Sequence, residues 1–440
     1  MRMNVSRLLA MCLLGGLLCM VSCGKTRERV ILGDERFEEY VPGLEGKRVA
    51  VFSNHSGIVG DVVKGSKLAD ALDPSGGRLF SGKDFDRIAG IPFTEPSEPG
   101  GTIEYGPHLV DILLEKGVDV RAIFSPEHGF RGTADAGEGV ESGVDEKTGV
   151  EILSLYGKNR SLGDEAMGKF DVLLVDIQDV GLRYYTYYVT MHHLMEACAR
   201  YGKKVIILDR PNPNGFLVDG PILDMSFKSG VGWLPVTTVH GMTLGELALM
   251  INGEGWMEDG LKCDLEVVPC LNYDHSTRKT LIVPPSPNLK DMRAVYLYAS
   301  TCYFEGTVVS LGRGTDYPFE MFGHPDMPDR GYSFTPRSVA GAKNPPLLDL
   351  ECHGFDLTGK PLEEIWEEGI NLEYVVTAFK DLNMGEAFFG KNNFFNLLAG
   401  VGYIKEMILA GASASEIKAR WKDDVEEFKV RRRSYLLYDE

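Results

Sequence analysis

The sequence predicts an α/β protein that begins with a parallel sheet covered by helices on both faces and continues into a second domain. Short, β-rich apolar runs alternate with amphipathic segments of helical period between residues 48 and 268. Such alternation is typical of βαβ units, whose strands lie parallel. Polar residues also follow four of these runs directly, and ligands bind beyond the carboxyl ends of strands in such sheets.

Five apolar runs are expected to form the strands of the sheet. Their Val, Ile and Leu content is typical of strands that are buried on both faces. The runs are Arg48–Phe52, Val118–Phe124, Asp171–Asp176, Lys204–Asp209 and Asp264–Val268. The amphipathic segments predict helices at His108–Lys116, Thr190–Tyr201 and Thr243–Asn252.

The rest of the chain is expected to form the second domain, after a proline-rich linker at Leu281–Leu289. In this domain the pattern favours strands at Val295–Thr301 and Thr307–Ser310, and helices at 390–409 and 414–429. The predicted domains therefore span residues 36–280 and 281–440.

Residues 60–102 interrupt the alternation of strands and helices. They are rich in Gly, Ser, Asp and Pro. Two interpretations stay open for this insert: a loop or lid over the sheet, or a disordered segment.

The N-terminus has the pattern of a signal peptide. Arg2 and Arg7 are followed by Leu8–Val21, an unbroken run of apolar residues and glycines. This run has 14 residues, whereas a helix that spans a bilayer needs about 20. We therefore expect export rather than a transmembrane anchor.

Cys23 follows Ser22 at the end of the apolar run, as in a bacterial lipobox. Cleavage before Cys23 would leave a lipidated N-terminal cysteine. Residues 1–23 are then the signal peptide, residues 24–35 are a tether, and the protein is a membrane-anchored lipoprotein that faces the periplasm. The alternative is ordinary signal cleavage without a lipid.

The formal net charge of −18 at pH 7 argues against non-specific binding of nucleic acid. The chain has no GxGxxG, Walker A, GxSxG or CxxC motif. The adjacent His192 and His193 diverge by about 100° on a helix, so they do not face one metal ion. We expect no cofactor and no metal, and the sequence makes no prediction of oligomeric state.

Polar residues follow four predicted strands. Because parallel strands end at the same edge of a sheet, these four loops are expected to meet. They contain Ser53–Ser56, Ser125–His128, Asp176–Arg183 and Asp209–Asn212.

Glu127 is the strongest candidate for a catalytic residue. It lies in Ser125-Pro126-Glu127-His128-Gly129, between a buried strand and a glycine-rich stretch. A carboxyl group that is partly shielded from water has a raised pKa and can act as a general acid. His128 could orient it or share its proton. The alternative is a carboxylate that caps a turn or pairs with Arg131.

The segment Gly181–Tyr188 contains one arginine and four tyrosines. The planar guanidinium of Arg183 is suited to a carboxylate ligand, and tyrosines such as Tyr185 present faces and hydroxyls suited to sugars. The alternative places some of these tyrosines in the core. His240 is expected either to point at the cleft or to be a structural histidine.

Two further candidates lie in the second half of the chain. Glu305 and Arg313 occupy short segments flanked by glycine. If the second domain folds over the sheet edge, Glu305 becomes a second carboxylate of the site. The alternative is an interdomain salt bridge between Glu305 and Arg313.

Taken together, these motifs resemble the exo-β-N-acetylmuramidase (NamZ-like) family, and they occur in the expected order over nearly the whole mature chain. The segments that carry the resemblance are Val51–Gly57, Phe124–Gly132, Val175–Tyr187, Leu208–Pro213, Pro285–Leu289, Phe304–Thr307 and Gly312–Thr315.

The resemblance implies a Rossmann-like catalytic domain and a smaller C-terminal α/β domain. It implies an exo-acting glycoside hydrolase that releases N-acetylmuramic acid from the non-reducing end of peptidoglycan fragments, with Glu127 as the catalytic glutamate. The insert at 60–102 is longer than the resemblance leads us to expect.

The substrate then suggests roles for the other candidates. Arg183 or Arg313 would bind the lactyl carboxylate, and Asn54 or Asn288 the acetamido group. The second catalytic group would be a carboxyl group or the acetamido group of the sugar itself. The carboxyl candidates are Asp176, Asp209 and Glu305.

Two other functions remain open at this point. The first is a lipoprotein that binds muropeptide sugars without cleaving them. The second is an amidase or esterase for cell-wall substituents, which the absence of a nucleophile motif disfavours.

Overall fold

The computed structural model describes residues 29–72, 82–126, 130, 143–155 and 162–440. A seven-stranded sheet forms the centre of the first domain, in the order β5-β6-β4-β1-β7-β8-β9. Its strands are β1 (Arg48–Ser53), β4 (Asp119–Ser125), β5 (Gly143–Val144), β6 (Glu151–Ser154), β7 (Val172–Asp176), β8 (Lys204–Leu208) and β9 (Asp264–Val268).

All the pairs in this sheet are parallel except β5 with β6 at one edge. Val51 at the centre of β1 pairs with Ile123 of β4 on one side and with Leu174 of β7 on the other. The predicted parallel sheet and all five predicted strands are therefore confirmed. The short strands β5 and β6 were not predicted.

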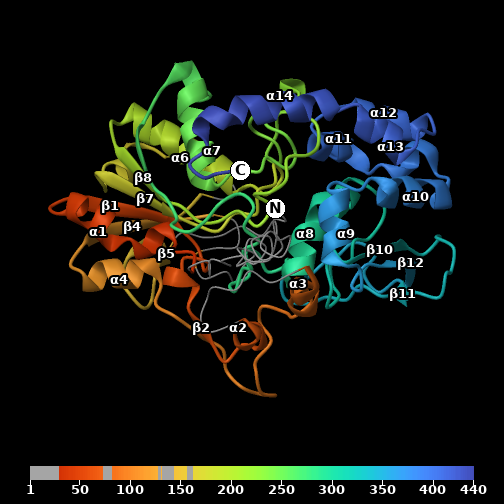
Figure 1. The fold of residues 1–440 in the computed structure, drawn as a ribbon, viewed down its shortest axis with the longest axis horizontal. Coiled ribbons are helices and arrows are strands. Elements are labelled where there is room, and N and C mark those ends of the chain that lie inside the picture. Colours follow the sequence, from red (N-terminus) through yellow and green to blue (C-terminus); the bar gives the residue numbers. More distant parts are fainter. Residues whose placement is uncertain (1–28, 73–81, 127–129, 131–142, 156–161) are drawn as a thin grey trace, which may run out of the picture.

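Side chains of each strand alternate between two apolar layers. Val49 and Val51 pack with α1 (Phe37–Tyr40) and α4 (Leu109–Glu115), whereas Ala50 and Phe52 pack on the side of α6 (Tyr187–Arg200) and α7 (Leu244–Glu254). Figure 1 shows α1 and α4 below the sheet and α6 and α7 above it. This is the layering of a doubly wound, Rossmann-like fold.

The second domain is mostly helical and has a three-stranded antiparallel sheet in the order β10-β12-β11. Its strands are β10 (Met321–His324), β11 (Ser333–Phe334) and β12 (Cys352–Asp356). Its helices are α8 (Met292–Thr301), α9 (Leu362–Glu368), α10 (Glu373–Leu382), α11 (Phe394–Ala399), α12 (Tyr403–Leu409), α13 (Ala414–Ala419) and α14 (Lys422–Arg432). The long α14 runs back across the top of the molecule toward α7 (Figure 1).

Two strands predicted in this domain are wrong. Val295–Thr301 belongs to α8, which Asp291 caps by accepting a hydrogen bond from the Ala294 N–H at 2.8 Å. Every residue of α8 is buried, so its apolar run shows no helical period. Thr307–Ser310 forms only isolated bridges, with Phe389 and Gly323.

Helix α3 (Gly82–Ala89) of the insert is docked on the second domain. The described part of the insert contains β2 (Val63–Lys64), α2 (Lys67–Ala71) and α3, and β3 (Glu104–Tyr105) follows it. Phe85 is buried and packs edge-on against Trp366 of α9, with ring centroids 5.5 Å apart. The main-chain N–H of Leu362 donates to Asp86 at 2.6 Å. These contacts of α3 differ from those of a disordered segment, and residues 73–81 lie outside the described residues.

The folded body starts earlier than residue 36. Leu32 and Asp34 are buried, Ile31 forms a bridge with Leu271, and the Gly33 N–H donates to the Asp209 carbonyl at 2.9 Å. The predicted tether therefore extends no further than about residue 30, because the residues after it pack against the end of the sheet.

Candidate functional site

The polar loops meet at the point where the strand order reverses. From β1 the chain builds β4 and β6 on one side, and it then returns to place β7, β8 and β9 on the other side. In doubly wound sheets ligands bind at this switch point, beyond the carboxyl ends of the strands. Here the loops after β1 and β7 flank it, at Asn54–Ser56 and Ile177–Arg183.

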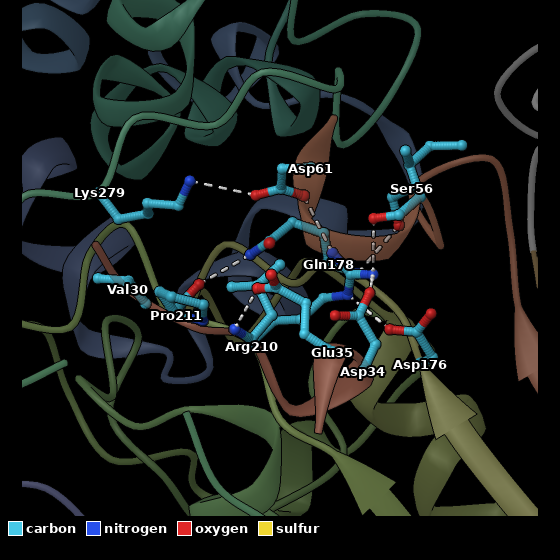
Figure 2. Close-up of polar contacts among 12 residues, drawn as sticks. Val30, Asp34, Glu35, Ser56, Asp61, Asp176, Gln178, Arg210, Pro211 and Lys279 are labelled. Atoms are coloured by element: carbon cyan, nitrogen blue, oxygen red, sulfur yellow. Dashed lines mark hydrogen bonds and ion pairs between the residues drawn. The ribbon is translucent and has the colours of Figure 1, made fainter. Parts of the chain in front are cut away.

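Gln178 binds three of these loops together. Its main-chain N–H donates to Ser56 Oγ at 3.0 Å, and its side-chain amide donates to the carbonyls of Asp179 and Pro211 at 2.8 Å each. Figure 2 shows Gln178 between Ser56 and Pro211. The loops after β1, β7 and β8 therefore form one hydrogen-bonded unit.

Asn54 is fully buried and holds the turn after β1. Its Oδ1 accepts from the N–H and Oγ of Ser56 at 2.9 and 2.6 Å, and its Nδ2 donates to the Tyr187 hydroxyl at 3.0 Å. The amide is thus engaged at both ends, which differs from the predicted role as a ligand for an acetamido group.

The linker between the domains crosses this edge of the sheet. The Tyr185 hydroxyl donates to the Pro285 carbonyl at 2.6 Å, and His55 Nε2 lies 2.7 Å from the Pro284 carbonyl. Asn288, further along the linker, donates to the Gly341 carbonyl at 3.1 Å. Tyr185 and Asn288 therefore hold the linker in place, and both are buried.

Gly57 leaves room for three polar groups beneath the β1 loop. A Cβ at this position would lie 2.7 Å from His108 Nε2 and 3.1 Å from Asp176 Oδ2, and still closer to Ser53 Oγ. These groups do not form a catalytic triad. His108 Nδ1 accepts the Val110 N–H, so the proton is on Nε2, which donates to the Asn54 carbonyl at 2.8 Å. The imidazole therefore cannot take the proton of Ser53.

A buried ionic cluster lies next to this turn. It contains Asp34, Asp61, Asp176, Arg210 and Lys279, and we call it the Arg210 cluster (Figure 2). Arg210 contacts the three carboxylates at 2.6, 3.1 and 2.6 Å, and Lys279 lies 3.2 Å from Asp61. Three carboxylates face two cations, so full ionisation leaves one excess negative charge. Burial raises the pKa of Asp34 well above its ordinary value, and the Arg210 guanidinium opposes this shift.

The Arg210 cluster accounts for Asp176, which was predicted to be catalytic. Asp176 is fully buried and its Oδ1 binds Arg210 Nε. Its Oδ2 is buried without a hydrogen-bond partner among the described residues. The ion pair ties Asp176 to the interior, below the polar loops.

Asp209 is also engaged. It accepts hydrogen bonds from Gly245 N, Thr243 Oγ1 and the Tyr438 hydroxyl at 2.9, 2.7 and 2.6 Å. Burial raises its pKa to about 6, and the hydroxyl and N–H donors oppose the shift. Asp209 therefore anchors the start of α7 and the C-terminal tail, and these bonds engage both oxygens of a carboxyl group that was a candidate for the second catalytic group.

Arg183 requires a correction, because it was expected to clamp a substrate carboxylate. The side chain is fully buried, and its guanidinium donates to the carbonyls of Pro221, Val236 and Ala399 at 2.7, 2.9 and 2.6 Å. Ala399 ends α11 in the second domain, so Arg183 joins the two domains. Gly400 follows with φ of 75°, and a Cβ there would overlap the guanidinium.

His240 is a buried neutral histidine. Its Nδ1 accepts the Met242 N–H at 3.2 Å, and burial together with the nearby Arg432 and Arg183 lowers its pKa to about 3. Its Nε2 has no hydrogen-bond partner among the described residues. The structural alternative for His240 is the one that this geometry favours.

Glu305 and Arg313 form the predicted ion pair. Arg313 Nη2 lies 2.5 Å from Glu305 Oε1, and both side chains keep about a fifth of their surface exposed. Both residues belong to the second domain, so the pair does not connect the two domains. They remain accessible from solvent, unlike Asp176 and Arg183.

Asp179 is a site residue that sequence analysis passed over. Its Oδ1 accepts the Gly181 N–H at 2.7 Å, and its Oδ2 is buried without a hydrogen-bond partner among the described residues. Burial raises the pKa of this carboxyl to about 7, and the main-chain N–H groups of Gly181 and Val180 oppose the shift. Its position directly after a strand was the available signal, but the neighbouring Asp176 was chosen instead.

Four predicted site residues lie outside the described residues, namely Glu127, His128, Arg131 and Cys23. In the described part of the chain, no three His, Cys, Asp or Glu residues are grouped to hold a metal ion. None of the described helices is long and apolar enough to cross a bilayer.

The fold and the site together define a doubly wound α/β protein with polar loops gathered at its switch point. Comparison with known proteins gives the family. Residues 97–293 match the N-terminal model of exo-β-N-acetylmuramidase NamZ, and residues 296–438 match the C-terminal model. The chain therefore belongs to the NamZ family of glycoside hydrolases, as its motifs led us to expect.

Individual relatives agree with this assignment. The peptidoglycan β-N-acetylmuramidase NamZ of Bacillus subtilis (strain 168) is 37% identical over 354 residues, which are 75% of this chain and 82% of that protein. A crystal structure of a DUF1343 family protein from Bacteroides fragilis is 52% identical and superposes with a TM-score of 0.78, over 93% of this chain and 99% of that one. A second B. fragilis structure, 24% identical with a TM-score of 0.70 over 94% of this chain and all of that one, shows the fold alone.

Proposed function

We propose that this protein is an exo-β-N-acetylmuramidase that releases N-acetylmuramic acid from the non-reducing ends of peptidoglycan fragments. The observation that carries the proposal is the match of both NamZ family models over residues 97–438. The curated relative, named as a peptidoglycan β-N-acetylmuramidase, supports the same substrate. Ligands of doubly wound sheets bind at the switch point, and this supports the polar loops there as the site for the sugar.

Glu127 is proposed as the general acid that protonates the leaving oxygen. It follows β4 by two residues, and β4 pairs with β1, one of the two strands that flank the switch point. General acid catalysis of this kind contributes about 10²–10⁴-fold to a rate.

The glutamine variant Glu127→Gln tests this role. We expect kcat on a chromogenic N-acetylmuraminide to fall at least about 100-fold, because the amide has no proton to give to a leaving oxygen. Glu104→Gln is the matched control, since Glu104 is exposed in β3. Activity of Glu127→Gln within a few-fold of the wild type would reject Glu127 as the acid.

Mass analysis of products from a defined cell-wall disaccharide tests the proposed function itself, and binding without turnover would favour the binding-protein alternative.

Membrane attachment through a lipid on Cys23 is part of the proposal. The apolar run before Cys23 is too short to span a bilayer, and a small residue precedes the cysteine. We expect the variant Cys23→Ala to move the protein from the membrane fraction to the soluble exported fraction. Retention of Cys23→Ala in the membrane fraction would contradict the lipid anchor, and Cys19→Ala serves as a control within the signal peptide.

A further inference from the structure

The second catalytic group of the site is open, because the expected carboxylates are all engaged. Asp176 binds Arg210, Asp209 accepts three hydrogen bonds, and Glu305 is paired with Arg313. Donors of this kind stabilise the charged form of a carboxylate and so lower its basicity, and at Asp209 they offset part of the rise in pKa that burial causes.

Asp176 also has an oxygen without a partner, but Asp179 differs from all three residues because no cation and no side-chain donor among the described residues holds its carboxyl group. Oδ1 is held by the Gly181 N–H, which orients the carboxyl group, and Oδ2 has no partner among the described residues. The side chain is only 6% exposed. Buried polar atoms in native proteins are rarely left without a partner, and the exceptions call for an explanation such as a catalytic role.

The position of Asp179 supports such a role. It lies three residues beyond the end of β7, in one of the two loops that flank the switch point. Gln178 ties this loop to the loops after β1 and β8, so the carboxyl group belongs to the rigid edge of the sheet. Among the described residues, the charge of Asp179 contributes to the raised pKa values of Tyr185 and Tyr188. The hydroxyl of Tyr185 also binds the linker.

We propose that Asp179 is the second catalytic carboxyl group, and that it takes the N–H proton of the substrate's own acetamido group while that group attacks the anomeric carbon. This inference rests on the proposed function, and it makes the 2-acetamido group a reactant rather than a recognition element. The acetamido group of N-acetylmuramic acid supplies the nucleophile, as in substrate-assisted glycosidases.

The reaction has two steps. In the first, the acetamido oxygen bonds to C1 and the C1–O bond to the leaving sugar breaks. The general acid protonates the leaving oxygen, and the N–H proton moves to Asp179 Oδ2, which gives a neutral oxazoline. In the second, water bonds to C1 as the oxazoline C1–O bond breaks. Asp179 returns its proton to the nitrogen, and the water proton restores the general acid.

The burial of Asp179 suits this task. Because burial raises the pKa of its carboxyl to about 7, the group gains and loses a proton readily near neutral pH. The reaction needs its ionised form, so kcat/KM is expected to fall as the pH drops through about 7.

The variant Asp179→Asn tests the proposal. Asparagine keeps an oxygen for the Gly181 N–H but cannot take a proton. We expect kcat on a chromogenic N-acetylmuraminide to fall about 100-fold or more with a KM within a few-fold, and the acidic limb near pH 7 to disappear. Asp224→Asn is the matched control, because Asp224 is exposed and caps a short helix.

Three further measurements complete the test. Fluorination of the N-acetyl group weakens its oxygen as a nucleophile, so the wild-type rate is expected to fall steeply from acetyl to difluoroacetyl substrates. NMR of the first product is expected to show retention of the anomeric configuration. Thermal unfolding of Asp179→Asn near the wild-type temperature shows that the loss of rate is not a loss of fold.

Several results would overturn the proposal. Near wild-type kcat in Asp179→Asn, a flat response to fluorination, or inversion at C1 would each do so. If Asp179→Asn unfolds, Asp179→Glu takes its place, because glutamate keeps the carboxyl group. An acidic limb of the pH profile that is unchanged in Asp179→Glu would also count against the proposal. If the wild type releases no N-acetylmuramic acid at all, the proposed function fails instead, and the two failures are thereby distinguished.

Discussion

The variant Arg210→Met is expected to lower the free energy of unfolding by about 3–5 kcal/mol, the usual cost of removing one partner from a buried ion pair. Arg210 contacts Asp34, Asp61 and Asp176, and its own side chain is only 2% exposed. Without it, three buried carboxyl groups face Lys279 alone. Urea unfolding of the variant and of the wild type measures the difference.

The matched control for this prediction is Arg48→Met. Arg48 pairs with Asp171 at 2.7 Å, but the two side chains are 42% and 38% exposed, so we expect a loss below about 1 kcal/mol.

The loss of unfolding free energy in Arg210→Met should also be smaller at pH 5 than at pH 8. Carboxyl groups that lose their cation have raised pKa values, so they bind protons at the lower pH, and the stability this gives is lost as the pH rises. Equal losses in Arg48→Met and Arg210→Met would contradict the role assigned to the Arg210 cluster.

The second large effect is expected for Arg183→Met. The carbonyls of Pro221 and Ala399 would lose their donor, whereas the Val236 carbonyl keeps the Leu223 N–H at 3.1 Å, and each unsatisfied group costs about 1–3 kcal/mol. Because Ala399 belongs to the second domain, we also expect the single thermal transition to broaden or split as the domains uncouple. Differential scanning calorimetry measures both changes.

This prediction separates two roles for Arg183. A substrate clamp would leave the Met variant stable and raise only KM, whereas a structural arginine lowers stability first. Arg330→Met is the control, since Arg330 is 38% exposed and pairs with Asp381 at 2.7 Å near the surface. A stable Arg183→Met protein with a raised KM would restore the clamp.

Local sequence signals predicted the sheet well. The five apolar runs became β1, β4, β7, β8 and β9 because strands buried on both faces need continuous β-rich segments. The same reasoning failed for α8, where burial on all sides removed the helical period and only the Asp291 cap marked the start. The docking of the insert through Phe85 depends on a partner, Trp366, that lies far away in the sequence.

The candidate site was predicted as a place, but not residue by residue. Parallel strands end at one edge, so the sequence predicted that four polar loops lie together, and the described residues confirm this for the loops after β1, β7 and β8. The ordered motifs of the sequence indicated the family. Only the tertiary structure decided which polar side chains are bound by partners inside the protein. Arg183 binds carbonyls of both domains, Asp176 binds Arg210, and Asp179 keeps one oxygen without a partner among the described residues. The physical reason is that hydrogen bonds and burial set the charge and reach of a side chain, and both depend on residues that only the fold brings near.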